Sequence, residues 1–260
     1  SAGYFFEHPE DIRLYGVSFQ TSVAGASVGG EISYRPNMPM QINTGDMSRT
    51  ALQLGADNTH RDYADVAPGT YIPGYQRKEF WQAQVSVIQF FDRVLGASRL
   101  ALVGEAGVNY ISGLGDVKFG RDSLFGQSPF VDGDTGLGAL PAGQCSSNEG
   151  TAAGRSPNAA SWCENDGFYT SWSSGYRIRA SLDYSNVIAG INLSPNVSWS
   201  HDVEGYGPNF TEDAKAISVG LNADYGNKYN ASISYTDFFD GKYNTAVDRD
   251  FASVSFSVSF

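Results

Sequence analysis

The sequence predicts an all-β protein, an antiparallel up-and-down transmembrane β-barrel with about nine strands in this chain. Three observations predict this fold class. Polar and apolar residues alternate along nine segments, the connections between segments alternate between short and long, and aromatic residues gather at both segment ends. Side chains on a strand point to opposite faces in turn, so each segment has one apolar and one polar face.

The nine segments carry their apolar faces as follows, in chain order. They are 12–24 (Tyr15, Val17, Phe19), 27–36 (Val28, Ile32, Tyr34), 77–91 (Trp81, Val85, Val87), 98–111 (Leu100, Leu102, Val108), 174–185 (Tyr176, Ile178, Leu182), 189–202 (Leu193, Val197, Trp199), 214–226 (Ile217, Val219, Leu221), 228–238 (Tyr229, Ile233, Tyr235) and 250–260 (Val254, Phe256, Val258). Segment 98–111 is the least regular, because Ala101 and Val103 interrupt its polar face.

The carboxy-terminal segment shows the alternation most clearly, since serines occupy every second position opposite its apolar residues. This pattern predicts a membrane strand with an apolar face toward lipid and a hydroxyl face toward the barrel interior. It also resembles the carboxy-terminal signal that the barrel-assembly machinery reads. Phe256, Val258 and Phe260 are therefore the candidate assembly signal.

The connection lengths indicate which end of the barrel is which. Short connections lie near 25, 92–97, 185–189 and 226–228, and longer ones lie between the other segments. Outer-membrane barrels have short periplasmic turns and longer extracellular loops. We therefore expect a single barrel domain over 1–260, with long extracellular loops at about 37–75 and 112–173 that show no helical periodicity.

Aromatic residues form two groups along the segments. The group near the long connections contains Tyr15, Tyr34, Trp81, Tyr110, Tyr176, Trp199 and Tyr235, and the group near the short turns contains Phe91, Tyr184, Tyr225, Tyr229 and Phe260. Two aromatic bands separated by aliphatic residues are typical of two membrane interfaces. A soluble sandwich also alternates, but it has no reason to keep this order.

Nine strands are an odd number, whereas an up-and-down barrel with both ends in the periplasm closes on an even number. We therefore expect at least one further strand and a larger barrel, of which this chain is the carboxy-terminal part. The alternative is a closed eight-stranded barrel with the first segment outside the sheet.

Composition excludes several other classes of protein. Charged residues make up 17% of the chain, the formal net charge is −11, and the pI is near 4.6. A nucleic-acid partner is not expected for so acidic a chain. The chain has no run of 18 apolar residues, so no transmembrane helix is expected. It has no glycine-lysine phosphate loop either, so no nucleotide or other cofactor is expected.

Residues 4–19 (YFFEHPEDIRLYGVSF) and 30–37 (GEISYRPN) resemble an uncharacterised family of large proteobacterial outer-membrane proteins with a domain of unknown function. The resemblance extends over most of the chain and implies that this motif lies in the middle of a longer protein. It also implies a distant similarity to outer-membrane channels for hydrophobic compounds and an association with efflux-type transporters. The family implies no catalytic residues.

Cys145 and Cys163 are the two cysteines of the chain, and both lie in the longest predicted loop. This arrangement favours one disulfide in an oxidising compartment over a metal site. Asp132 and Asp134 have part of a calcium-loop spacing, and a second acidic cluster spans 57–65. The full ligand set is absent, so solvated acidic loops are the preferred interpretation and no metal site is predicted.

Seven charged residues are predicted to point into the barrel and are the candidate lumen or constriction residues: Arg177, Arg179, Asp183, Glu31, Arg35, Glu105 and Asp224. An interior arginine pair needs counter-charges on neighbouring strands unless water fills the space. These residues are either a salt-bridge network that stiffens the wall or a charged constriction that selects solutes.

The sequence favours a porin-like channel in the bacterial outer membrane for passive passage of small organic or hydrophobic solutes, and not an enzyme. The alternative is a structural or docking barrel that partners an envelope efflux or transport system. A third, less favoured hypothesis is an outer-membrane hydrolase, for which only His201 lies near a serine and an acid, and adjacent strand residues face opposite ways. Expected partners are the lipid bilayer, lipopolysaccharide, the barrel-assembly machinery and an N-terminal part of the same protein.

Overall fold

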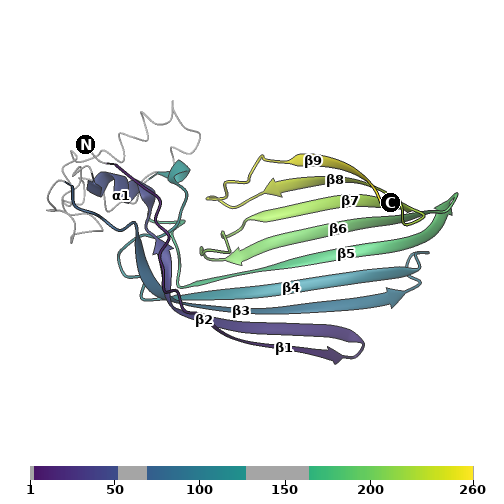
Figure 1. Ribbon diagram of the computed structural model, residues 1–260, viewed down its shortest axis with the longest axis horizontal. Helices are drawn as coiled ribbons and strands as arrows, with labels where there is room; N and C mark the ends of the chain where they lie inside the picture. The colour runs from purple at the N-terminus through teal and green to yellow at the C-terminus, as the bar shows by residue number, and fades with distance from the viewer. Residues whose placement is uncertain (1–2, 52–68, 127–163, 260) are drawn as a thin grey trace.

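The fold, in a computed structural model that describes residues 3–51, 69–126 and 164–259, is one nine-stranded antiparallel sheet in which every strand pairs with the next along the chain (Figure 1). The strands are β1 (Tyr15–Val23), β2 (Ala26–Gln41), β3 (Tyr75–Asp92), β4 (Arg99–Ser112), β5 (Trp172–Ile188), β6 (Ile191–Glu204), β7 (Lys215–Tyr225), β8 (Tyr229–Phe239) and β9 (Phe251–Val258). Two short helices complete the described part: α1 (Thr44–Ala51) and the 3-10 helix η2 (Ser123–Phe125).

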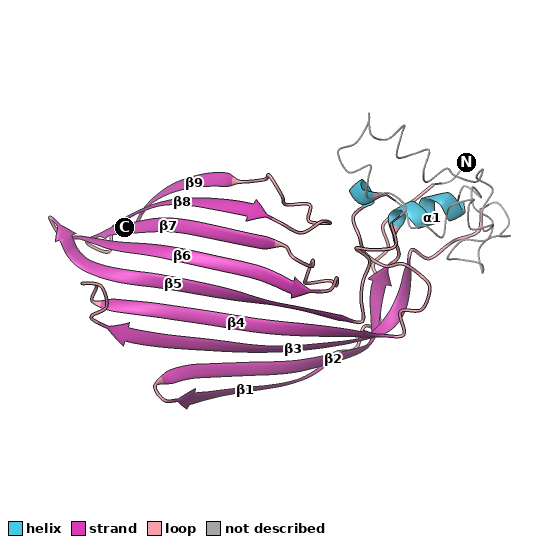
Figure 2. Ribbon diagram, turned by 180° about the vertical axis from the view of Figure 1, so that it is seen from behind, coloured by secondary structure: helices cyan, strands magenta, loops and turns pink. Residues whose placement is uncertain are grey.

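The predicted all-β class and the nine strands are confirmed, whereas the predicted closure is not present. Among the described residues, β1 and β9 each have one neighbouring strand and lie at opposite edges of the sheet (Figures 1 and 2). The alternative of an eight-stranded barrel without the first segment is wrong. β1 is paired along its whole length with β2, from Tyr15 opposite Tyr34 to Val23 opposite Ala26.

The two ends of the sheet differ as the connection lengths predicted. The turns at 24–25, 93–98, 189–190 and 226–228 lie at one end, and the four longer connections lie at the other. Ala24 and Gly25 both have positive φ, as do Ala189 and Gly190, so each pair forms a two-residue hairpin turn whose twist suits antiparallel strands.

The long connections begin later and contain more structure than the sequence predicted. β2 continues to Gln41 beyond a bulge between Arg35 and Met38, and α1 occupies part of the predicted loop 37–75. The side chain of Asn43 accepts a hydrogen bond from the Asp46 backbone N–H at 3.1 Å. Asn43 therefore caps the start of the helix, and this local bond explains a helix that apolar periodicity did not reveal.

The packed core lies at the long-connection end rather than along the sheet. One cluster joins the outer ends of β2, β3 and β4 to residues of the connections, and consists of Met40, Ile42, Phe80, Ile111 and Phe119. A second cluster contains Phe125, Tyr206 and Tyr243, with Tyr169 against both clusters. Figure 2 shows α1 and the neighbouring loops gathered at this end, beyond the strands β2 and β3.

Candidate functional site: the polar face and its cap

The strand register gives the sheet one polar face, on which directly opposed residues follow one another across the strands. Glu31 lies opposite Gln84, Glu105 opposite Arg177, and Arg177 opposite Ser200. Toward β9 this face carries hydroxyl pairs, with Oγ–Oγ distances of 2.7 Å between Ser232 and Ser255 and 2.8 Å between Ser234 and Ser253. All seven candidate charged residues belong to this face by register: Glu31, Arg35, Glu105, Arg177, Arg179, Asp183 and Asp224.

The face does not gather these seven residues into one cluster. Arg177 donates a hydrogen bond to Asp202 on β6 at 2.9 Å, and Asp183 pairs with Arg99 on β4 at 2.9 Å. Arg177 and Asp183 therefore have separate partners, each from the neighbouring strand. The Asp202 and Arg99 partners were not among the predicted residues, because Asp202 lies at a strand end and Arg99 beside a turn.

The remaining candidates have different surroundings. Arg35 lies over the ring of Phe80 at 5.6 Å, and Asp224 accepts a hydrogen bond from the Asn227 backbone in the β7–β8 turn. Asp224 thus stabilises a turn at the far end of the sheet. Within the described ranges, no ion pair involves Glu31, Glu105 or Arg179, so these charges remain on an open part of the polar face.

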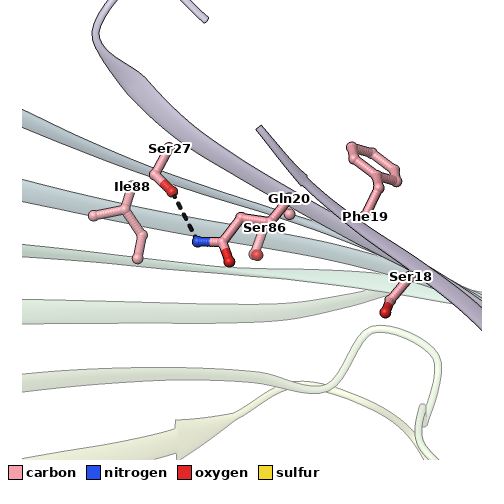
Figure 3. A pocket seen from close by; sticks show the side chains of 7 residues that line it. Ser18, Phe19, Gln20, Ser27, Ser86 and Ile88 are labelled. Carbon is pink, nitrogen blue, oxygen red and sulfur yellow. Dashed lines mark hydrogen bonds between the residues drawn. The ribbon is translucent and has the colours of Figure 1, made fainter. Parts of the chain in front are cut away.

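A shallow hollow on the polar face near the short-turn end illustrates the alternation (Figure 3). Ser18 and Phe19 point to opposite sides of β1, and Gln20 donates to Ser27 across β1 and β2 at 3.4 Å. The lining combines hydroxyl and amide side chains with Gly29 and the apolar Phe19 and Ile88, and no charged residue belongs to it. This half of the polar face is therefore open and mainly hydroxyl and amide, with Ile88 as an apolar exception.

Parts of three long connections contact the other half of the polar face, and the β8–β9 connection packs against them through Tyr243. We call these parts the cap and define it as residues 42–47, 113–126, 164–171, 205–214 and 240–250. Phe80 and Ile111, which lie on the polar side of their strands, are 2% and 1% exposed beneath it. The polar face therefore becomes apolar where the cap covers it.

Arg121 joins three segments of the cap. Its guanidinium donates to the backbone carbonyls of Glu164 and Asp166 at 2.9 and 2.8 Å, and it lies over the Phe168 ring at 3.9 Å. The backbone carbonyl of Arg121 accepts a hydrogen bond from Asn43 at 3.2 Å. One buried side chain thus fixes 113–126 against 164–171, and its backbone fixes it to the start of α1.

Glu164 extends this network to the β8–β9 connection. Its carboxylate accepts hydrogen bonds from the Tyr243 hydroxyl and from Lys242, the latter at 2.7 Å. Burial alone would raise the pKa of the Glu164 carboxyl, but the hydrogen bonds and the charges of Lys242 and Arg121 together hold its pKa below the ordinary value. Burial, with Glu164 nearby, raises the pKa of the Tyr243 hydroxyl, so the pair is ionised carboxylate and neutral phenol.

The β6–β7 connection forms a small hairpin within the cap. Tyr206 and Thr211 form a bridge, and the Gly207 backbone N–H donates to the Phe210 carbonyl at 2.9 Å. The hairpin folds back so that the Phe210 ring lies against Gly107 and Gly175 on the polar face. Sequence reasoning missed Phe210 because it lies in a connection and belongs to no alternating segment.

The opposite face of the sheet is apolar and uncovered. Its exposed residues include Val17, Ile32, Val85, Ile178, Val219, Ile233, Val254 and Phe256. Val254 is 78% exposed and Phe256 is 69% exposed. An apolar surface of this extent exceeds what water-soluble monomers normally expose.

Aromatic side chains form a row across this apolar face near the long connections. Tyr15, Tyr34, Trp81, Tyr110 and Trp172 lie directly opposite one another on five successive strands. The ring centroids of Tyr34 and Trp81 are 4.2 Å apart, and those of Tyr110 and Trp172 are 4.6 Å apart. Trp172 joins this row in place of Tyr176, which instead accepts a hydrogen bond from Trp199.

The possible hydrolase residues do not converge. Ser200 lies opposite Arg177 on the polar face, whereas His201 lies opposite Tyr176 on the apolar face. No helix in the described segments is long and apolar enough to cross a membrane. The same segments contain no group of three or more His, Cys, Asp or Glu residues arranged to hold a metal ion.

Several predicted features fall outside the described residues. Phe256 and Val258 lie in β9, but Phe260, the third residue of the candidate assembly signal, lies outside. Cys145 and Cys163 lie outside as well, as do Asp132, Asp134 and the acidic cluster at 57–65. The disulfide and the assembly signal therefore remain predictions.

A family model described as a protein of unknown function (DUF1302) matches residues 1–260. The chain belongs to the DUF1302 family. Neither the curated proteins nor the solved structures include a significant match to it.

The motif that carried the resemblance has a defined place in this DUF1302 chain. The β2 bulge presents Asn37, whose side-chain amide accepts from the Arg13 backbone N–H at 2.9 Å and donates to the Asp11 carbonyl at 2.7 Å. Arg77 on β3 donates to the Glu10 carbonyl at 2.7 Å. The two halves of the motif are therefore in contact, and they fix the entry of the chain into β1.

Proposed function

We propose that the nine-stranded sheet is part of the wall of a β-barrel in a bacterial outer membrane. The apolar face would contact lipid and lipopolysaccharide, and the polar face would line the interior. The uncovered apolar face supports this orientation, since lipid removes the cost of exposing Val254 and its neighbours to water. The aromatic row supports an interface with the bilayer near the long connections.

A complete barrel requires further strands. β1 and β9 run in the same direction, because nine strands alternate across the sheet. A direct β1–β9 pair would be parallel, so an antiparallel barrel needs an odd number of additional strands between the two edges. We propose that another part of the same protein supplies them, and that the barrel-assembly machinery inserts the product with β9 as part of the recognised signal.

The barrel is proposed to be a channel for passive passage of small organic solutes, including partly hydrophobic ones. The observation that carries this proposal is that the polar face is open along one half of the strands and covered along the other half. Its open half presents hydroxyls, amides and the charges Arg179 and Glu105, and its other half lies under the cap. A polar interior supports a solute path, and a cap of packed connections supports a restriction of that path.

Solute flux into liposomes tests the channel. The intact protein is reconstituted, and liposome swelling is followed in neutral sugars and amides of increasing size. Flux that falls with solute size is expected, together with faster flux after deletion of residues from the cap. Swelling is a better readout than electrical recording, because a hydrophobic solute that leaves sideways through the wall carries no current.

A docking barrel is the second candidate, and the packing of the cap favours it. A cap fixed by Arg121 and Glu164 would also suit a barrel whose interior is closed and which binds a partner protein at one rim. Absence of solute flux in both the intact protein and its cap deletion would reject the channel and leave the docking barrel as the better proposal.

A further inference from the structure

We propose that Phe210 limits the size of the solutes that pass through this barrel, with the β6–β7 connection as the restricting segment. The inference rests on the proposed channel and assigns its size limit to one side chain. Phe210 is 9% exposed, and its ring lies on the polar face rather than among the apolar residues of the opposite face.

Two glycines of the sheet, Gly107 and Gly175, form the surface against which the Phe210 ring packs. A Cβ atom on Gly175 would lie 2.8 Å from Phe210 Cδ1, and a Cβ atom on Gly107 would lie 3.3 Å from Phe210 Cζ. These two glycines lie opposite each other on β5 and β4. A side chain at Gly175 would push the ring away from the wall, so the glycines set how far the ring projects.

Asp202 fixes the base of the hairpin to the wall. One carboxylate oxygen accepts from Arg177 and the other accepts from the Thr211 backbone N–H, both at 2.9 Å. The Asp202 backbone also exchanges hydrogen bonds with the connection, donating to the Ala214 carbonyl and accepting from the Asp213 N–H, each at 2.9 Å. Strand β6 thus holds Thr211, the residue that follows Phe210, through Asp202, and β5 holds Asp202 through Arg177.

The tip and the other side of the hairpin are held as well. Asn109 on β4 donates to the side chain of Asn209 at 3.0 Å. Thr170 exchanges hydrogen bonds with the backbone of Tyr206, donating at 2.9 Å from its own backbone N–H and accepting at 2.9 Å with its hydroxyl. The hairpin is therefore pinned on both sides of Phe210, and the ring has a fixed position.

The position of Phe210 relative to the charges defines the proposed limit. Arg177 lies 5.8 Å from the ring centroid, Glu105 lies directly opposite Arg177, and Arg179 follows toward the short-turn end. A solute that enters beneath the cap would meet the aromatic ring first and the charges next.

The size limit for neutral solutes is the measurement that tests this inference. Swelling rates for a graded series of sugars and amides are compared for liposomes with the intact protein, Phe210→Ala and Phe210→Leu. Phe239→Ala is the matched control, because Phe239 lies at the same end of the sheet but contacts Trp199 on the apolar face. The folded fraction of each variant is measured by the change of gel mobility on heating.

Phe210→Ala is expected to admit larger solutes several-fold faster than the intact protein, and Phe210→Leu is expected to be intermediate. Phe239→Ala should leave the size limit unchanged. If solutes pass and the size limit is the same in all three variants, Phe210 is not the limiting residue, although the proposed channel stands. No flux in any sample would overturn the channel and, with it, the role of Phe210. If Phe210→Ala does not fold, the folded Phe210→Leu is compared with the intact protein instead. A higher size limit in Phe210→Leu supports the role of Phe210, and an unchanged limit rejects it.

Discussion

The two faces of the sheet arise from the same alternation of polar and apolar residues but differ in how much of each the rest of the chain covers. The apolar face is uncovered from the aromatic row to the short turns, and many of its large side chains, such as Trp81, Val254 and Phe256, are exposed. The polar face is open at one end and is covered at the other by the chain's own connections, where Phe80 and Ile111 are buried. Alternation therefore determines which side of a strand a residue occupies, whereas the connections decide whether that side contacts solvent or protein.

This difference has a physical origin. In the proposed barrel, a bilayer covers the apolar face without any contribution from the chain, so no loop is needed there. A polar interior needs hydrogen-bond partners or water, and the cap supplies partners only at one end. The comparison can be tested on either face, and the following predictions begin with the largest expected effect.

Arginine substitutions on adjacent residues of β9 test the two faces directly. Val254→Arg places a charge on the proposed lipid face near the middle of the strand and should reduce the free energy of unfolding by about 2–4 kcal/mol. Ser255→Arg places the same charge on the polar face and should have a much smaller effect. Denaturant unfolding after refolding in lipid measures both. Equal effects would contradict the assignment of the faces.

Removal of the Arg121 side chain tests the cap. Arg121→Leu leaves the carbonyls of Glu164 and Asp166 without their donor and should cost about 1–3 kcal/mol of local stability. Hydrogen exchange at the amides of 118–126 and 164–170 should become faster. Arg249→Leu is the control, because Arg249 is an exposed arginine of the β8–β9 connection. Exchange that is unchanged in Arg121→Leu would show that the cap does not depend on this residue.

The arginines of the polar face are expected to differ. Arg177→Gln removes an ion pair with Asp202 and should cost up to about 1 kcal/mol, because the Arg177 side chain is partly exposed. Arg179→Gln breaks no ion pair among the described residues and should leave stability unchanged. In the proposed channel, both variants should shift the reversal potential toward cations. A shift in neither variant would remove these arginines from the solute path.

A pH titration is expected to produce the smallest effect and concerns Glu164. Its folded pKa lies below the ordinary value of 4.5, so its stabilisation of the cap is complete above that value. The stabilisation is lost as the pH falls through the lowered pKa. Proteolysis of the cap should therefore increase only in the acidic range, and Glu164→Gln should remove this dependence. An unchanged pH profile in Glu164→Gln would exclude Glu164 as its source.

The sequence alone was sufficient to predict the strands and their two faces, because alternation with a period of two assigns each residue to one side of its strand. The register that brings Glu105 opposite Arg177 could not be read from one segment, since pairing depends on the neighbouring strand. Phe80 was a further difficulty, because an apolar residue on a polar face breaks the pattern that identifies the strand. Phe210 gave no periodic signal, although the Gly-Pro-Asn sequence before it indicates a turn.

The placement of Phe210 on Gly107 and Gly175 also bears on the order in which the protein folds. β3 and β4 are joined by the turn 93–98 and β5 and β6 by 189–190, whereas β4 must find β5 across residues 113–171. Closing a longer chain costs more entropy, so each hairpin should form before the hairpins join. Phe210 follows the second hairpin and contacts both, so its docking can occur only after they have met. It is then one of the last contacts to form, and its loss should accelerate unfolding more than it slows folding.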